Sequence, residues 1–247
     1  MLSKTILKYL QSLHHKKFRD EHGVFIAEGP KIVGELLSSK QFKCKLICGI
    51  EDWLHQNEEL IKPVSKENIF LINEQELERI SLLQTPNKVL AVFLKKEDVL
   101  ISLKDTISIM LDEIQDPGNM GTIIRTADWF GIKNIICSKN CVDMYNPKVV
   151  QSSMGSLGRV NIIYAELENF LNNNRHVNVY AATLDGVSIY TIDKFKEGVI
   201  IVGNESKGIN KELVKYAFKQ ITIPKLGEAE SLNAAVATGI ILSYISK

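Results

Sequence analysis

The amino-acid sequence predicts an α/β protein whose C-terminal part is built on a mainly parallel sheet. Short, nearly continuous apolar runs, the pattern of strands covered on both faces, alternate with amphipathic helical runs along the chain. Segments rich in glycine and asparagine follow several of the apolar runs, as they do at the carboxyl ends of parallel strands. At 247 residues the chain is long enough for one large domain or two small ones.

Residues 1–95 are predicted to form a small α/β domain of their own. Its strands are the runs VFIAEG, CKLICGI, NIFLIN and VLAVFLK, and its helices include PKIVGELLSSK and NEQELERISLL. The segment that follows, KKEDVLISLKDT, is polar and has no sustained periodicity. We therefore expect residues 96–106 to be a linker.

Residues 107–247 restart the alternation and predict the parallel sheet. Its strands are the runs ISIMLDEI, NIIC, VNVYAAT, GVIIVGNE and QITIP. Ligands of such sheets bind in the crevice at the carboxyl ends of the strands. The segments that follow the strands therefore form the candidate site: QDPGNMG, TLDG, GNESKG and PKLGEAESLN.

The net charge is only +1, so a polyanionic partner would have to be held by a local patch. One basic run precedes the first acidic residue, Asp20, and comprises Lys4, Lys8, Lys16, Lys17 and Arg19. Such a run fits contact with RNA phosphates, although more often it is only a solvated helix face.

The four cysteines form two C-x3-C pairs, Cys44 with Cys48 and Cys137 with Cys141, which is not the C-x2-C spacing of zinc sites. The first cysteine of each pair falls in or beside an apolar strand, so we expect buried reduced thiols, no metal and no disulfide. No run approaches the roughly 18 apolar residues of a membrane span, and the N-terminus lacks a signal-peptide core. We expect a cytoplasmic protein without a membrane partner.

The segment DPGNMGTIIRTADWFGI predicts a helix that begins after a turn at Pro117 and Gly118. Asn119 is the expected N-cap and Gly131 the expected stop. Five apolar residues recur at helical spacing and supply its buried face: Met120, Ile123, Ile124, Ala127 and Phe130.

Arg125 interrupts this apolar run, and two explanations are open. It shares a stripe with Gly121, whose missing side chain would leave space for another group beside the arginine. Alternatively, Arg125 pairs with Asp128 three residues on, which stabilises a surface helix by roughly 0.2–0.5 kcal/mol. The segment is neither a Rossmann fingerprint nor a P-loop, because it lacks the first glycine of G-x-G-x-x-G and any Gly-Lys-Ser/Thr.

Two further segments after strands contain the residues of a ligand site. Gly203 at a strand end would let a ligand approach the backbone, with Glu205 in the crevice; the alternative is a capped turn with a solvated Glu205–Lys207 pair. Ser231 lies at the expected start of the last helix, with Asn233 two residues in. Its free backbone N–H groups suit an anionic or hydroxyl-bearing ligand, and the alternative is an ordinary N-cap. The small residues of that helix predict close packing.

Taken together, NMGTIIRTA, VGNESKGI and IPKLGEAESLNAAVATGI, in this order and spacing, resemble the three motifs of the SpoU family of RNA ribose 2′-O-methyltransferases in the SPOUT superfamily. NPKVVQSSMGS at 146–156 resembles the family's intermediate segment, and FIAEGPKIVGELL resembles the small RNA-binding substrate domain that many members carry. The resemblance implies a deep trefoil knot, a rare exception to unknotted topology, which forms the S-adenosylmethionine pocket. It also implies a homodimer with the C-terminal helix in the interface.

The resemblance assigns roles to residues at matching positions. The matching active-site residues are Asn119, Arg125, Glu205, Ser231 and Asn233. The matching cofactor loops, 183–186, 203–205, 221–226 and 231–232, contain Thr183, Leu184, Gly186, Gly203, Asn204, Ile223, Leu226, Ser231 and Leu232. The expected RNA contacts are Lys16, Lys17, Arg19, Lys31 and Arg125. Gln151 departs from the pattern, because relatives often have a basic residue before SSMGS.

The implied reaction is transfer of a methyl group from S-adenosylmethionine to a ribose 2′-hydroxyl of structured RNA. The extra N-terminal domain favours large-subunit ribosomal RNA over tRNA. A guanidinium with a pKa above about 12 is nearly always protonated, so a phosphate clamp suits Arg125 better than the base role proposed in the family. The alternatives are a tRNA methyltransferase, a non-catalytic RNA-binding or ribosome assembly factor of the same fold, and an NAD enzyme, the last disfavoured by the absent fingerprint.

Overall fold

The computed structural model describes residues 2–39, 41–97 and 100–245. The chain divides into two compact units, Met1–Glu97 with Tyr145–Arg159, and Asp98–Met144 with Val160–Lys247. The linker predicted at residues 96–106 coincides with the first boundary between the units. The return of residues 145–159 to the first unit is not apparent from the sequence pattern.

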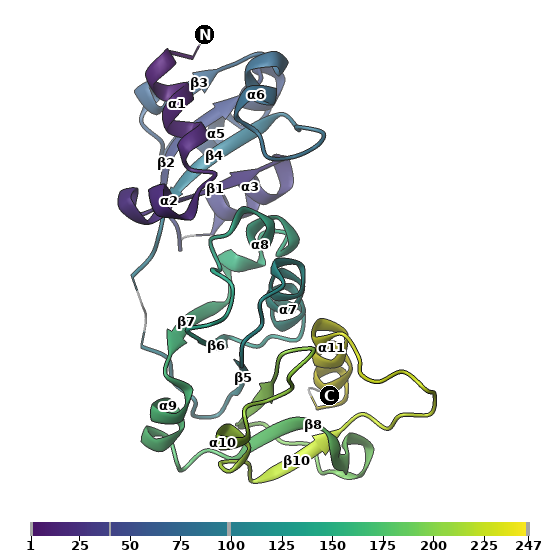
Figure 1. Ribbon diagram of the computed structural model, residues 1–247. Coiled ribbons are helices and arrows are strands. Elements are labelled where there is room, and N and C mark those ends of the chain that lie inside the picture. Colours follow the sequence, from purple (N-terminus) through teal and green to yellow (C-terminus); the bar gives the residue numbers. More distant parts are fainter. Residues whose placement is uncertain (1, 40, 98–99, 246–247) are drawn as a thin grey trace. The chain divides into compact units, whose positions relative to one another are not determined.

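The first unit is built on a four-stranded sheet in the order β1-β4-β2-β3 (Figure 1). One strand corresponds to each predicted apolar run: β1 (Val24–Glu28), β2 (Cys44–Gly49), β3 (Ile69–Leu71) and β4 (Val89–Leu94). β4 is antiparallel to both β1 and β2, and β3 is parallel to β2. The helices are α1 (Lys4–Ser12), α2 (Lys16–His22), α3 (Pro30–Ser38), α4 (Glu51–Gln56), α5 (Glu58–Ile61), α6 (Glu74–Ile80) and α8 (Pro147–Ser152), with 3-10 turns at Lys66–Asn68 and Ser156–Gly158.

Local sequence explains where helices of this unit begin and end. α6 begins with a capping box, in which Asn73 Oδ1 accepts from Glu76 N at 2.9 Å and Glu76 Oε2 accepts from Asn73 N at 3.3 Å. α2 ends at Gly23, whose φ of +60° lies in the left-handed region that favours glycine.

The segment Tyr145–Arg159 packs into the first unit through ring and backbone contacts. The Tyr145 ring stacks on Phe25 of β1 with a centroid distance of 4.9 Å. Gly155 lies so close to α3 that a Cβ there would be 2.5 Å from the Cβ of Glu35. Arg159 Nη1 lies 2.5 Å from Glu35 Oε2. A fragment that starts at residue 107 would therefore lose the surface on which this segment packs.

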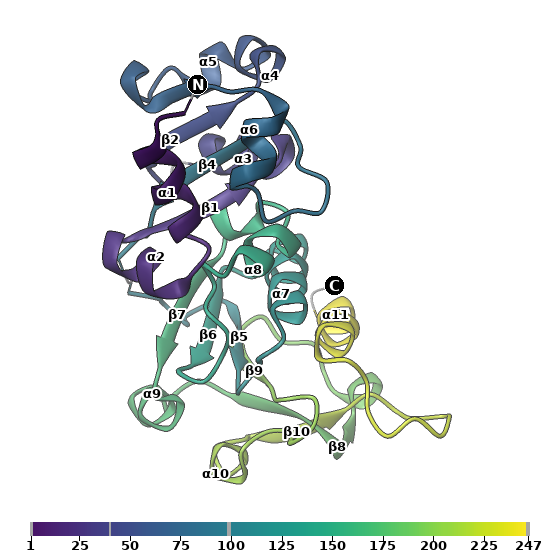
Figure 2. The ribbon, with the colours of Figure 1, turned by 45° about the horizontal axis from the view of Figure 1, so that its top comes forward.

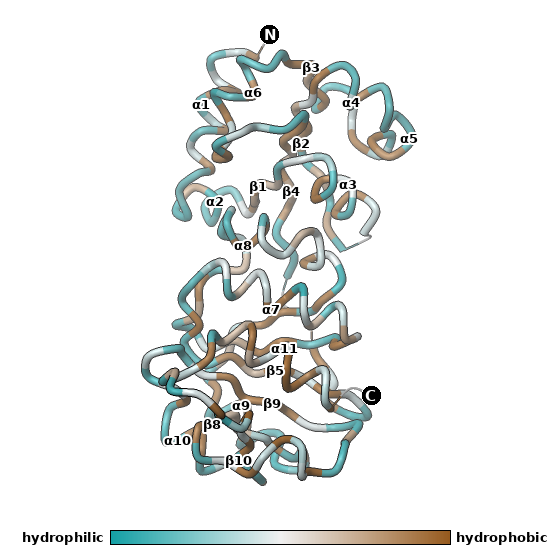
Figure 3. The backbone as a smooth tube through the Cα atoms, turned by 90° about the vertical axis from the view of Figure 1, so that its right-hand side faces the viewer, coloured by the Kyte–Doolittle hydropathy of each residue, from teal (hydrophilic) through white to brown (hydrophobic). Residues whose placement is uncertain are grey.

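The second unit is built on the predicted parallel sheet, which has six strands in the order β10-β8-β9-β5-β6-β7 (Figure 2). The strands are β5 (Ile107–Leu111), β6 (Asn134–Ser138), β7 (Asn161–Ala165), β8 (Val179–Ser188), β9 (Gly198–Val202) and β10 (Lys219–Thr222). Every pairing is parallel, which confirms the prediction. The central strands β5 and β9 are buried at every position, which explains their apolar sequences (Figure 3).

Helices cover this sheet: α7 (Pro117–Trp129), α9 (Leu167–Asn173), α10 (Lys211–Val214) and α11 (Ala234–Ile245), with a 3-10 turn at Ile189–Thr191. α11 packs against α7, and a Cβ at Gly239 would lie 3.7 Å from Thr126 Cγ2. Ala234 and Ala235 are buried. The small residues of the last helix thus serve packing within the chain.

Three of the four cysteines, Cys48, Cys137 and Cys141, are buried and Cys44 is half-buried, all as free thiols. Within the described residues, no helix is long and apolar enough to cross a membrane.

Candidate active site at the carboxyl ends of the parallel strands

Three of the predicted active-site residues meet in one hydrogen-bonded chain. Asn119 lies in the first turn of α7, Glu205 in the loop after β9, and Asn233 directly before α11. Asn119 Nδ2 donates to Glu205 Oε1 at 2.5 Å, and Asn233 Nδ2 donates to Asn119 Oδ1 at 2.8 Å. Residues that are 86 and 114 positions apart in the chain are therefore joined by the fold.

The backbone of α11 sets the orientation of all three side chains. Asn233 Oδ1 accepts from Ala235 N at 2.9 Å and from Val236 N at 3.2 Å, so the amide oxygen of Asn233 must face the helix. Its Nδ2 then faces Asn119 and needs an acceptor, which orients Asn119 Oδ1 toward it. The remaining Asn119 Nδ2 donates to the Glu205 carboxylate. The contacts that cap α11 therefore also orient the Glu205 carboxylate, through Asn233 and Asn119.

The structure corrects both predicted helix caps. The N-cap of α7 is Asp116, whose Oδ1 accepts from Asn119 N at 2.8 Å, and not Asn119. Asn233, not Ser231, accepts from the first turn of α11. Because Asp116 caps the helix, the Asn119 side chain is released for the contacts with Glu205 and Asn233.

Arg125 is exposed on α7, and no hydrogen bond or ion pair joins its side chain to another residue that the structure describes. The surface pair with Asp128 is therefore not formed. Gly121, which shares a stripe with Arg125, is buried. The fold leaves the Arg125 guanidinium facing solvent, outside the hydrogen-bonded chain of Asn119, Glu205 and Asn233.

Ser231 and its neighbours form an exposed segment between β10 and α11. Residues 224–233 are all exposed, and the chain projects outward here from the second unit (Figure 1). Among the described residues Ser231 has no hydrogen-bond partner. The structure thus brings together three of the five predicted active-site residues and leaves the side chains of Arg125 and Ser231 available.

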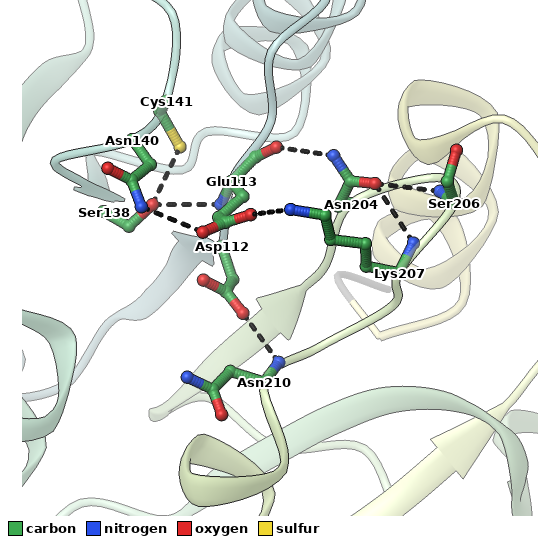
Figure 4. Close-up of polar contacts among 9 residues, drawn as sticks. All are labelled: Asp112, Glu113, Ser138, Asn140, Cys141, Asn204, Ser206, Lys207 and Asn210. Carbon is green, nitrogen blue, oxygen red and sulfur yellow. Dashed lines mark hydrogen bonds and ion pairs between the residues drawn. The ribbon is translucent and has the colours of Figure 1, made fainter.

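Glu113, just after β5, anchors the loop that carries Glu205 (Figure 4). Asn204 Nδ2 donates to Glu113 O at 2.9 Å, and Lys207 Nζ lies 3.0 Å from Glu113 Oε2. Hydrogen bonds from Asn140 and Lys207 hold the pKa of the Glu113 carboxyl below its usual value. Because Lys207 pairs with Glu113 and Glu205 with Asn119, the alternative of a solvated Glu205–Lys207 pair is wrong.

Asp112 holds the far end of the same loop. Its Oδ2 accepts from Asn210 N at 2.7 Å, and burial raises the pKa of this carboxyl (Figure 4). Sequence reasoning missed both Asp112 and Glu113. The available signal is the acidic pair that ends the apolar run ISIMLDEI.

Gly203 and Gly186 are required by close packing of the main chain on itself. A Cβ at Gly203 would lie 2.3 Å from Gly208 C, and one at Gly186 would lie 2.5 Å from Ile221 C. Close packing within the chain is therefore sufficient to explain the glycine at position 203. Asn204 and Gly208 pair as an isolated bridge across this turn.

The predicted cofactor loops lie at one end of the sheet. Residues 183–186, expected as a loop, lie within β8, and Thr222 Oγ1 donates to Leu184 O at 3.0 Å, which places them beside the end of β10. The pairing of Ala181 with Ile201 brings the residues after β9 next to the same segment. Large apolar side chains are left exposed here, on Leu184, Leu226 and Leu232. Uncovered apolar groups beside polar main chain fit a ligand with an aromatic ring and polar substituents, such as the adenosyl group.

The predicted RNA contacts differ in their exposure. Lys16, Lys17 and Lys31 are exposed, although Lys16 pairs with Asp20 at 2.5 Å. Arg19 is only 2% exposed, and its Nη1 donates to Leu13 O at 3.2 Å and His14 O at 3.0 Å. The expectation of Arg19 on a solvated basic face is therefore wrong, because its guanidinium ties the end of α1 to α2. In the described part of the chain, no group of three or more His, Cys, Asp or Glu could hold a metal ion.

Comparison with known proteins finds two family matches that follow one another along the chain. Residues 106–243 match the SpoU rRNA Methylase family, and residues 4–91 match the MRM3-like substrate binding domain. The 23S rRNA (guanosine(2553)-2′-O)-methyltransferase RlmP of Bacillus subtilis is 28% identical over 97% of this chain and 95% of its own length. The mitochondrial rRNA methyltransferase 3 of Xenopus laevis is 32% identical over 97% of this chain and 73% of its own length.

Solved structures resemble the whole chain. An AdoMet-bound rRNA methyltransferase from Sinorhizobium meliloti superposes with a TM-score of 0.89 and 34% identity, over 99% of this chain and 96% of that one. A TrmH-family protein from Porphyromonas gingivalis superposes with a TM-score of 0.87 and 36% identity, over 99% of this chain and 98% of that one.

Proposed function

This chain belongs to the SpoU rRNA Methylase family, and from that premise we propose that it transfers a methyl group from S-adenosylmethionine to a ribose 2′-hydroxyl of RNA. The observation that carries the proposal is the hydrogen-bonded chain of Asn119, Glu205 and Asn233. It joins all three segments that resemble the family motifs, at the end of a parallel sheet where ligands bind.

The side chains divide into those that shape the site and those that are available to RNA. Asn119, Glu205 and Asn233 satisfy one another and so hold the geometry of the site. Arg125 is exposed, and a planar guanidinium can clamp a phosphate beside the reacting ribose and stabilise the developing alkoxide. Ser231 is exposed too, and its hydroxyl can donate or accept a hydrogen bond at the ribose.

The cofactor supplies the electrophilic methyl group, and the chain must align the ribose oxygen with it. We assign its binding to the loops 183–186, 203–205, 221–226 and 231–232. Leu184, Leu226 and Leu232 would cover the adenine ring, because burying their exposed surface is favourable. We also propose the family's trefoil knot: β10 lies at the sheet edge beside β8, and the chain returns from it to pack α11 on α7.

Large-subunit ribosomal RNA is the proposed substrate. The two rRNA methyltransferases named above match this chain across 97% of its length, so the likeness includes the first unit as well as the second. A tRNA substrate is the alternative. Within the first unit we assign phosphate contacts to the exposed Lys17 and Lys31, and we keep the cytoplasm as the expected location.

Incubation of the full-length protein with labelled S-adenosylmethionine and ribosomal RNA tests the reaction. We expect label in a 2′-O-methylated nucleoside after nuclease digestion, and no label with tRNA. A thermal-shift comparison should show stabilisation by S-adenosylmethionine and not by NAD, since a ligand stabilises only the protein that binds it. Cofactor binding without methylation of either RNA would favour the non-catalytic assembly factor and contradict the proposal.

We propose a homodimer in which α7 and α11 face the partner, with contacts made by large exposed side chains and not by the small residues of α11. Ala234 and Ala235 are buried within the chain, so they are not available for a partner. Trp129 on α7 is 84% exposed and Val236 on α11 is 52% exposed, and burying such side chains favours association.

Replacing Val236 with Asp should therefore convert the dimer to a monomer, because a buried unpaired carboxylate is costly. Light scattering should give twice 27.8 kDa for the unmodified chain and about 27.8 kDa for Val236→Asp. Leu71→Asp, which places the same charge at an exposed position of the first unit, is the matched control and should stay dimeric. A wild-type monomer that methylates RNA would contradict the proposal.

A further inference from the structure

A pocket of about 550 Å³ lies in the first unit, within the size range of small-ligand sites. It is bordered by the start of α2, the end of β1, the segment after α6, and α8. All of these elements belong to the first unit. None of the five predicted active-site residues lines it, so it is separate from the site described above.

One side of the pocket is apolar and held rigidly. Leu82 and Leu83 line it, and Leu82 is 46% exposed. Leu82 N donates to Glu28 Oε1 at 3.0 Å, Leu83 N donates to Ser81 Oγ at 3.0 Å, and Ser81 Oγ donates to the Glu28 carboxylate. An exposed leucine on a segment with three anchoring hydrogen bonds offers a preorganised surface to a flat apolar ligand.

The rim of the pocket is cationic, whereas its interior holds two opposite charges, Glu28 and the buried Arg19 guanidinium, whose Nη1 donates to main-chain carbonyls. Lys16 and Lys148 line the pocket and are exposed. Lys16 also pairs with Asp20, whereas Lys148 has no ion-pair partner among the described residues. His15, also exposed, adds an imidazole ring. Glu28 lines the pocket too but is only 6% exposed. The two buried charges offset one another, so the interior favours a neutral group, and an anionic group belongs at the rim beside the lysines.

The group that enters the pocket must therefore be neutral, flat and able to donate hydrogen bonds toward a carboxylate. A nucleobase attached to a phosphodiester has all three properties. We propose that this pocket binds one unpaired nucleotide of the substrate RNA. Its base lies against Leu82, Leu83 and His15 and faces Glu28, and its phosphate lies between Lys16 and Lys148. The inference rests on the proposed function, because it takes RNA as the ligand.

The arrangement selects single-stranded over paired RNA. In a duplex the base faces are stacked on their neighbours and the edges are hydrogen-bonded to the partner strand, so no base can enter a pocket. The first unit would in this way recognise a loop or bulge of structured RNA, beyond the general attraction of its lysines for phosphates.

Binding of the full-length protein to a short single-stranded RNA and to a blunt duplex of the same sequence tests this. Leu82→Ala should weaken single-strand binding about fivefold, because the apolar surface that covers the base is lost, and leave duplex binding unchanged. Lys148→Ala should weaken single-strand binding and reduce the slope of log affinity against log salt by about 0.7, the value for one phosphate contact.

Matched controls exist in the same unit. Leu71→Ala removes a leucine that is 56% exposed on β3, and Lys62→Ala removes an exposed lysine after α5, both outside the pocket. Both controls should bind RNA as the unmodified chain does. A photoreactive thiouridine in the single strand should cross-link to the peptide that contains Leu82 and Leu83.

Wild-type single-strand affinity in both Leu82→Ala and Lys148→Ala would overturn the proposal. A glutamate-rich peptide tests the competing ligand. If the unmodified chain binds this peptide, and both variants lose affinity for it while they keep their affinity for RNA, the proposal is overturned and the pocket binds a protein segment. Cofactor binding and methylation, measured on the same variants, report on the proposed function separately. A protein that methylates no RNA and binds no cofactor would contradict the proposed function and not the assignment of this pocket.

Discussion

Arg125→Ala is expected to lower the single-turnover methylation rate about 100-fold or more at saturating S-adenosylmethionine, the loss seen when one group that stabilises transition-state charge is removed. Arg125→Lys should fall nearly as far, because lysine keeps the charge but lacks the planar fork that binds a phosphate through two hydrogen bonds. The free energy of unfolding should change by no more than about 0.5 kcal/mol, since Arg125 is exposed and has no partner among the described residues.

Three measurements separate the catalytic from a structural role for Arg125. Calorimetry should give unchanged S-adenosylmethionine affinity in both variants, and thermal melting should give unchanged stability. Arg175→Ala, which removes an exposed arginine hydrogen-bonded to Asn172 after α9, should methylate at the normal rate. A near-normal rate in Arg125→Ala would remove the phosphate clamp from the mechanism and leave the site without a cation at the reacting ribose.

Gly203→Ala is expected to abolish S-adenosylmethionine binding and to lower the melting temperature by about 6–12 °C, the equivalent of about 3 kcal/mol in a chain of this size. The added Cβ would lie 2.3 Å from Gly208 C and 2.4 Å from Gly208 O. Both are main-chain atoms, so no side-chain rotation can relieve the contact. The turn 203–208 would have to open, which would move Asn204 away from Glu113 and Glu205 away from Asn119.

Gly34→Ala makes the same chemical change as Gly203→Ala but is expected to stabilise the protein. Gly34 lies inside α3, where a Cβ would meet only Leu60 Cδ2 at an ordinary 3.9 Å. Alanine there should raise the free energy of unfolding by about 0.5–1 kcal/mol, because it removes the entropic cost of a helical glycine. An unchanged melting temperature and normal cofactor binding in Gly203→Ala would show that the turn yields easily, and would exclude it as the support of Glu205.

Short-range patterns predicted most of the strands, but β7 (Asn161–Ala165) was not among the predicted runs. Each predicted apolar run of the first unit corresponds to a strand, and the five predicted runs after residue 107 form five of the six strands of the expected parallel sheet. Asn119, Glu205 and Asn233 were expected in one site because they follow strands whose carboxyl ends lie at one edge of the sheet. These predictions succeed because side-chain periodicity and post-strand position are local properties of the chain.

Roles within the site depended on partners that are distant in sequence. Asparagine is favoured at N-caps, but Asp116 is the N-cap of α7, and the Asn119 amide instead donates to Glu205. Arg19 has the pattern of a solvated basic face, but the carbonyls of Leu13 and His14 draw it into the interior. In both cases two local solutions were compatible with the sequence, and the contact that decides between them forms only in the folded unit.

The sequence by itself determined the α/β class, the parallel sheet and the three segments proposed for the site. Each of these follows from a side-chain periodicity or from a motif only a few residues long. Only the tertiary structure decided that Tyr145–Arg159 joins the first unit, that the small residues of α11 pack on α7, and that Glu113 anchors the loop of Glu205. Each of these depends on which surfaces meet across 90 or more residues, as with the 91 between Glu113 and Asn204. The physical reason is that a buried polar or apolar group takes the partner that the packed fold brings to it, and no local pattern specifies that partner.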